Sequence, residues 1–141
     1  MAETIGRDGV PDGWVMREAK GFSTHVGPFW MPPEGDRAAC GFVADARHGN
    51  KRGVVHGGML ATAFDVALGN AVWAAVEQRP CATVQLNVQF LAAVKLGEFA
   101  LARAEVLKLT RSLVFIRGLL TVDDRLVATA DGVWKILGRP G

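Results

Sequence analysis

The fold is decided by the stretch His56-Gly57-Gly58-Met59-Leu60-Ala61-Thr62-Ala63-Phe64-Asp65-Val66-Ala67-Leu68-Gly69-Asn70-Ala71-Val72-Trp73-Ala74-Ala75. Its apolar residues recur at helical spacing, which predicts a long helix that is apolar on most sides and runs to about Glu77. Such a helix has to be enclosed by other elements. Asp65 stands in its middle, where a carboxylate without a partner pays heavily for desolvation. We therefore expect a core helix that carries a buried, functional acid.

Strands are expected on both sides of this helix. Two short ones are predicted at Phe22–Trp30 and Ala38–Asp45, separated by turn-forming prolines and a glycine. After Pro80 the period changes to two, which is typical of half-buried strands. We expect a four-strand antiparallel meander over residues 83–90, 99–107, 113–122 and 126–137. The pattern predicts an α+β fold in which a curved antiparallel sheet wraps around one long central helix.

The remaining organisation is simple. Residues 1–20 contain glycines and a proline, so we expect a loop with one short helical turn near 14–20. Residues 21–141 are expected to form a single domain, because 141 residues are too few for two ordinary ones. An apolar share of 50% is high for so small a chain and predicts subunit interfaces.

Composition also argues against several classes of function. The net charge is only +2 and the basic residues are scattered, which gives nucleic-acid binding no support. Polar residues within 54–76 make a membrane span costly, and the first residues do not resemble a signal peptide. Cys40 and Cys81 lack metal-ligand spacing and are interpreted as reduced, buried residues. We expect a cytoplasmic protein.

The spacing of His56 and Asp65 predicts more than one subunit. They are nine positions apart (65 − 56 = 9), which on a helix is roughly 13 Å of rise and roughly half a turn out of phase. One helix cannot bring both side chains to the same substrate atom. If both act in one reaction, the acid of one subunit must serve a site headed by His56 of another.

Each candidate residue also has an ordinary structural interpretation. Asp65 can be hydrogen-bonded within a core or an interface, and His56 can cap a helix. Gly57-Gly58 permits a helix entry, Asn50 favours a turn, and Thr83 suits a strand.

Considered together, these residues resemble a known family. The resemblance rests on three parts of the chain: Asn50-Lys51-Arg52-Gly53-Val54-Val55-His56-Gly57-Gly58, then Asp65, then Pro80-Cys81-Ala82-Thr83-Val84-Gln85-Leu86-Asn87-Val88-Gln89-Phe90. They resemble the hotdog-fold acyl-CoA thioesterases, and among these the phenylacetate-pathway (PaaI-like) branch. The likeness extends from about residue 20 to the end of the chain.

The resemblance implies a role for each catalytic residue. Gly57 would donate its backbone N–H to the thioester oxygen, and His56 and Asn50 would shape that pocket. Asp65 of the partner subunit would act as a general base toward water or as a nucleophile. Thr83 would hold the attacking water, at a position where related enzymes commonly have serine.

For substrate binding, the resemblance implies Gly58 at the helix entry, and Lys108 and Arg111 near the nucleotide phosphates from a strand-connecting loop. The expected function is hydrolysis of acyl-CoA, including aryl-acyl-CoA, without a metal or bound cofactor. The expected assembly is a homodimer with shared active sites, further paired into a dimer of dimers. The alternative function is a non-catalytic module that binds or senses acyl-CoA on the same fold, and a hydratase ranks last.

Overall fold

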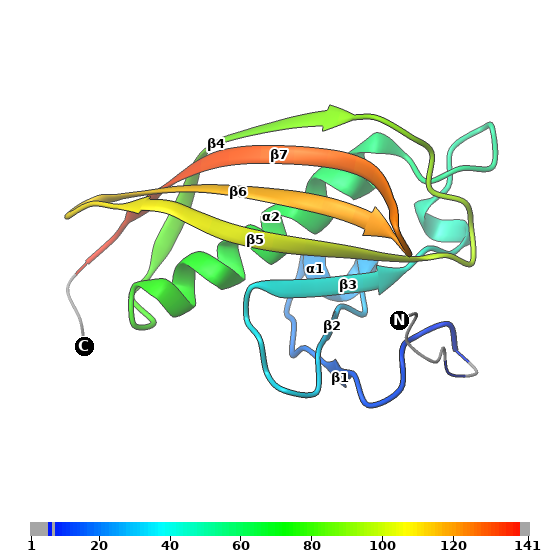
Figure 1. Ribbon diagram of the computed structural model, residues 1–141, viewed down its shortest axis with the longest axis horizontal. Coiled ribbons are helices and arrows are strands. Elements are labelled where there is room, and N and C mark those ends of the chain that lie inside the picture. Colours follow the sequence, from blue (N-terminus) through cyan, green and yellow to red (C-terminus); the bar gives the residue numbers. More distant parts are fainter. Residues whose placement is uncertain (1–5, 7, 139–141) are drawn as a thin grey trace.

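One long helix, α2 (Gly57–Ala75), lies along the concave side of a curved, seven-stranded antiparallel sheet (Figure 1). The computed structural model describes residue 6 and residues 8–138 of the chain. The side chains of α2 that face the sheet, such as Phe64, Leu68 and Val72, are fully buried and form the centre of the core. The predicted α+β fold, a curved sheet around one central helix, is confirmed.

Local signals set both ends of α2. His56 is the N-cap, and its Nδ1 accepts a hydrogen bond of 2.8 Å from the Gly58 N–H. At the other end Glu77 and Gln78 adopt positive φ angles of 56° and 67°. Two successive residues in the left-handed region cannot continue a right-handed helix, so α2 ends at Ala75, two residues before the predicted end.

The strands follow the chain as β1 (Val15–Met16), β2 (Trp30–Met31), β3 (Ala39–Val43), β4 (Cys81–Phe90), β5 (Phe99–Leu109), β6 (Leu113–Val122) and β7 (Arg125–Ile136). Their order in the sheet is β1-β2-β3-β5-β6-β7-β4. The predicted four-strand meander is therefore wrong in one respect. Strands β5, β6 and β7 form a meander, but β4 pairs with β7 at the edge and β5 pairs with β3.

The connection between β4 and β5 explains this order. Residues 91–98 are too many for a tight hairpin, and they cross the end of the sheet instead. The buried Val94 anchors the crossing, because its carbonyl accepts a hydrogen bond of 2.8 Å from the Val55 N–H. The chain then reaches β3, where the Ala44 N–H donates to the Glu98 carbonyl at 2.9 Å.

Two predictions for the N-terminal part are wrong. Residues 14–20 contain no helical turn, since Val15–Met16 form β1 against β2. The strand predicted for 22–30 is instead a short helix, α1 (Phe22–Val26), followed by β2. A distant side chain holds the end of α1: Arg47 donates to the carbonyls of His25 and Gly27. Such a tertiary cap overrides the local sequence preference.

Helix α2 is long and apolar enough to cross a membrane, and it is the one such helix in the described part of the chain. Half of its apolar window is buried inside the protein, under the sheet. This burial is typical of the core helix of a globular fold.

Close packing between β6 and α2 gives a stability prediction. A Cβ atom on Gly118 would lie 2.7 Å from Leu68 Cδ1 and 3.3 Å from Phe64 Cε1. Gly118→Ala is expected to lower the free energy of unfolding by about 1–3 kcal/mol, because the core must shift to accept the methyl group. Urea unfolding measures this. The exposed neighbour Arg117 is the control, since Arg117→Ala should cost at most about 1 kcal/mol.

Candidate active site

The N-terminal end of α2 offers one backbone donor for a ligand. The Gly58 N–H is capped by the His56 imidazole, and the N–H groups of Met59 and Leu60 both donate to the His56 carbonyl. The Gly57 N–H donates no hydrogen bond to any described residue. A helix N-terminus carries partial positive charge, so this N–H can stabilise a developing negative charge on oxygen.

Asn50 shapes the loop that leads to this helix. Its Oδ1 accepts a hydrogen bond of 2.9 Å from the Arg52 N–H, and its own N–H donates to the Val54 carbonyl at 2.8 Å. These are the contacts of an ordinary turn. The side-chain amide nitrogen of Asn50 donates to no other described residue.

His48 supports the same region, a role that the sequence did not indicate. It is buried, its carbonyl accepts from the His56 N–H at 2.7 Å, and its Nδ1 accepts from the Asp45 N–H at 3.0 Å. Its Nε2–H donates to the Val26 carbonyl at 2.6 Å. His48 thus connects α1, the short 3-10 turn η1 (Ala46–His48) and the start of α2. The neighbouring Arg47 side chain lowers the pKa of the Asp45 carboxyl by hydrogen bonding.

Asp65 lies on the part of α2 that the sheet leaves uncovered. The expected burial of its carboxylate is wrong for the single chain, in which Asp65 is exposed. One partner is present: the Thr83 hydroxyl donates a hydrogen bond of 2.8 Å to Asp65 Oδ1. The acid is therefore oriented toward β4 and still accessible for chemistry.

A β-bulge in β4 makes this contact possible. The sequence alternation predicted that Thr83 shares a face with Gln85 and Asn87, but the register shifts between Thr83 and Gln85. Thr83 pairs with the buried Trp134, whose indole packs toward α2, whereas Gln85 pairs with Val133 on the other face. The extra residue, Val84, rotates Thr83 to the helix side of the sheet.

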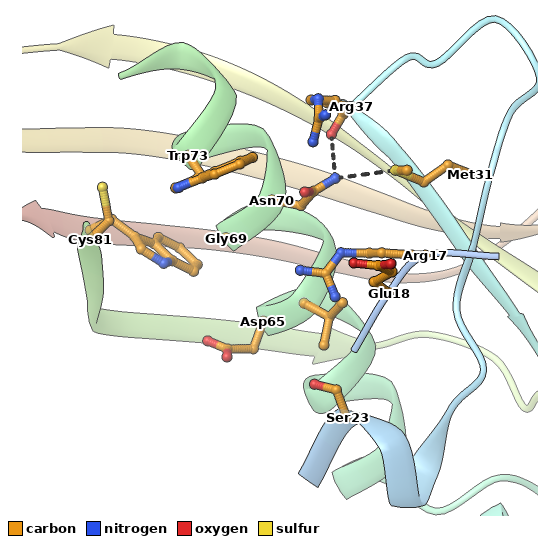
Figure 2. Close-up of a pocket in the computed structure, with 12 residues that line it drawn as sticks. Arg17, Glu18, Ser23, Met31, Arg37, Asp65, Gly69, Asn70, Trp73 and Cys81 are labelled. Carbon is orange, nitrogen blue, oxygen red and sulfur yellow. Dashed lines mark hydrogen bonds between the residues drawn. The ribbon is translucent and has the colours of Figure 1, made fainter. Parts of the chain in front are cut away.

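A cavity of about 610 Å³ opens beside Asp65 (Figure 2). The residues that line it come from the N-terminal segment, α1, β2, the loop before β3, α2, β4 and β7: Arg17, Glu18, Ser23, Met31, Arg37, Asp65, Val66, Gly69, Asn70, Trp73, Cys81 and Trp134. The Arg37 guanidinium lies 5.4 Å from the centre of the Trp73 ring. The buried Asn70 donates to the Arg37 carbonyl at 3.3 Å and fixes this loop on the helix.

Sequence reasoning missed most of this lining. Arg17 and Arg37 come from segments without any helical or strand periodicity, so nothing local associates them with Asp65. Asn70 could have been identified from the sequence, because a second polar residue within an apolar helix needs a hydrogen-bond partner.

The two halves of the predicted site do not meet within one chain. His56 and Gly58 line a separate depression of about 390 Å³, which shares no residue with the cavity beside Asp65. The helical-phase argument thus agrees with the structure: the two parts of α2 face different spaces.

The two predicted phosphate ligands lie elsewhere in the single chain. Lys108 belongs to β5 and not to a connecting loop, while Arg111 is in the turn before β6. Through the strand pairing Lys108 is level with Val133 of β7. Gly57 lies near Phe90, since a Cβ atom on Gly57 would be 3.3 Å from the Phe90 ring, and Phe90 is level with Ala128. Five residues of strand (133 − 128 = 5) separate these levels by roughly 17 Å.

The two cysteines have different surroundings. Cys40 is buried as expected, and burial raises the pKa of its thiol to about 11. Cys81 is only partly buried and lines the cavity beside Asp65, so the expectation for it was wrong. In the described part of the chain no group of three or more His, Cys, Asp or Glu side chains is arranged to hold a metal ion.

Comparisons with known proteins agree on one family. The model of the Thioesterase superfamily matches residues 52–129. The esterase-like protein PA0474 of Pseudomonas aeruginosa is 33% identical over 113 residues, which cover 79% of this chain and 84% of that protein. Human acyl-coenzyme A thioesterase 13 is 28% identical over 102 residues, 72% of this chain and 73% of that one. A phenylacetic acid degradation-related protein from Ralstonia eutropha superimposes with a TM-score of 0.67 at 27% identity, covering 88% and 85% of the two chains.

Proposed function

Because this chain belongs to the thioesterase superfamily, we propose that the groups around α2 form an active site that hydrolyses acyl-CoA thioesters. The resemblance to the hotdog-fold thioesterases and their PaaI-like branch is confirmed by the relatives and the fold. The observation that carries the site assignment is the accessible Asp65 carboxylate held by the Thr83 hydroxyl at 2.8 Å.

In the proposed reaction the Gly57 N–H binds the thioester oxygen. As the carbonyl carbon becomes tetrahedral, negative charge grows on this oxygen, and the helix N-terminus stabilises it. His56 and Gly58 hold the first turn in place through their hydrogen bond, and Asn50 shapes the loop beside it. None of these groups has to reorganise during the reaction.

Asp65 performs the bond-making step in one of two ways. As a general base it takes a proton from water, whose oxygen attacks the carbonyl carbon. As a nucleophile it attacks that carbon itself and forms a mixed anhydride, which water then hydrolyses. In both routes the C–S bond breaks, the CoA sulfur takes a proton, and the free acid leaves. Thr83 positions the water in either route, because its hydroxyl donates a hydrogen bond to Asp65 while its oxygen can accept one from the water.

The edge strand β4 supports the proposal of a shared site. It is ten residues long, it has an open edge, and Val84 and Phe90 are 60% and 54% exposed. Such an edge is a template for pairing with another chain. Within one chain Thr83 marks the Asp65 end of β4, and Phe90 marks the Gly57 end.

Antiparallel pairing of β4 with a second copy then completes the site. If the two-fold axis lies near Leu86, Thr83 comes opposite the partner's Phe90, which brings Asp65 toward the partner's Gly57. This arrangement unites the two halves that the single chain keeps apart. A homodimer is therefore part of the proposed mechanism.

Two further parts of the proposal concern CoA and the larger assembly. Lys108 and Arg111 are exposed, and we assign them to the CoA phosphates at a site completed by another subunit. The outer face of the sheet exposes 36% of Phe115 and 49% of Leu119, which favours a second interface and a dimer of dimers. Light scattering measures the number of subunits in the assembly. A monomer would contradict both the shared active site and the dimer of dimers.

A thiol-release assay tests the function. Acetyl-, hexanoyl-, palmitoyl- and phenylacetyl-CoA are each incubated with the protein, and free CoA is measured against time. We expect turnover of at least one of them, with the aryl substrate favoured because Trp73 and Trp134 line the cavity. Binding without CoA release across the panel would instead support a non-catalytic module.

Thr83 has a smaller and more specific predicted effect. Thr83→Ser keeps the hydroxyl and is expected to remain active. Thr83→Val keeps the shape but removes the hydroxyl, and it should lower kcat by about tenfold or more with little change in KM. Steady-state kinetics of both variants measure this. A Thr83→Val enzyme with the kcat of the wild type would leave Thr83 with a structural role only.

A further inference from the structure

We propose that the cavity beside Asp65 selects acyl groups that carry a second carboxylate, and that Arg17 recognises this carboxylate. The inference rests on the function proposed above, because it assigns the acyl group of the thioester to this cavity. It concerns which acyl-CoA the enzyme prefers, a property that neither the fold nor the site at Gly57 determines.

The first support is the charge of the lining. Arg17 and Arg37 are cationic and Glu18 and Asp65 are anionic, yet neither arginine forms an ion pair with any described residue. Arg37 is placed over the Trp73 ring. Arg17 thus remains as a guanidinium that lines a cavity without a carboxylate partner. The planar fork of N–H donors in arginine matches a carboxylate in two parallel hydrogen bonds.

The second support is that Arg17 is held in position. Its backbone N–H donates to the carbonyl of the buried Phe29 at 2.8 Å, and the side chain is half-buried. In Figure 2 its guanidinium extends from the N-terminal segment toward α2, on the side of Asp65 and Asn70.

The third support is the distance from the reacting atoms. Asp65 and Asn70 both line the cavity, and Asn70 lies five residues further along α2, about 8 Å of helix rise. The same lining includes the apolar side chains of Val66, Trp73 and Trp134. This space fits a short carbon chain or one aromatic ring between the thioester and the second carboxylate.

The test compares substrates that differ only in the distal group. Adipoyl-CoA is matched with hexanoyl-CoA, and 4-carboxyphenylacetyl-CoA with phenylacetyl-CoA. For the wild type, kcat/KM should be about tenfold higher for the carboxylated member of a pair. In Arg17→Met this preference should fall by about tenfold to a hundredfold, because a charge-assisted pair is lost. Arg17→Lys should keep only part of it.

Two controls distinguish the carboxylate of the acyl group from the CoA phosphates and exclude a general loss of activity in the Arg17 variants. The same pairs are measured as N-acetylcysteamine thioesters, which lack the CoA phosphates, and the preference should persist. Arg103→Met, an exposed arginine outside the cavity, should keep the preference of the wild type.

Three results would overturn the inference while leaving the proposed hydrolysis intact. One is a wild-type enzyme that prefers the neutral substrates. Another is an Arg17→Met enzyme impaired equally on both members of each pair, which would mean that Arg17 acts on Asp65 or on the fold. The last is a preference confined to the CoA esters, which would assign Arg17 to the phosphates. If no thioester is hydrolysed by the wild type, the proposed function itself fails.

Discussion

Asp65→Asn is expected to lower kcat by at least about a hundredfold on every thioester that the wild type hydrolyses. The amide cannot take a proton from water and cannot attack a carbonyl carbon. It can still accept the hydrogen bond that the Thr83 hydroxyl donates at 2.8 Å, so the local structure is retained. Because Asp65 is exposed in the single chain, the substitution leaves no buried charge without a partner, and the fold should be unchanged.

Thiol release measures the loss, and urea unfolding and light scattering establish that fold and assembly persist. Asp131→Asn is the matched control. Asp131 is also an exposed carboxylate that accepts one side-chain hydrogen bond, from Asn87 at 3.1 Å, but it lies on the outer face of the sheet. Its activity should stay close to that of the wild type. Full hydrolysis by a folded Asp65→Asn protein would remove Asp65 from the mechanism.

A mixture of two inactive variants is expected to regain activity, which is the second large effect. One variant is Asp65→Asn, and the other carries Asn50→Ala with His56→Ala. In a heterodimer one of the two sites combines intact loop residues from one chain with an intact Asp65 from the other. Random reassembly in equal amounts should therefore restore about a quarter of the wild-type activity.

The experiment requires that the subunits exchange. Two different affinity tags allow the heterodimers to be purified after joint unfolding and refolding, and their activity should be about half that of the wild type. Each variant is measured alone to establish that it folds and dimerises. Purified heterodimers without activity would show that both halves of the site come from one chain, contrary to the separation of the two cavities described above.

Much of the fold is encoded locally. The period of α2, its cap at His56 and the alternation in β6 and β7 depend on residues a few positions apart, and the structure has these elements close to the predicted bounds. The spacing of His56 and Asp65 likewise predicts the second subunit of the proposed shared site. Neither conclusion required any contact between distant parts of the chain.

The rest depends on contacts between segments that are far apart in sequence. Phe22–Val26 reads as a strand by itself and is a helix because Arg47 and His48 bind the carbonyls at its end. Residues 91–98 carry the chain from β4 across the end of the sheet to the side of β3, so β4 pairs with β7 and not with β5. No local sequence pattern predicts this pairing.

The sequence alone determined the helix, the strands of the meander and the residues from which a thioesterase site can be made. Only the tertiary structure decided how these residues face one another. The extra residue Val84 in β4 rotates Thr83 toward Asp65. The N-terminal segment contributes Arg17 to the cavity beside Asp65. The physical reason is that periodicity and capping are short-range, whereas register, bulges and cavity walls follow from packing over the whole chain.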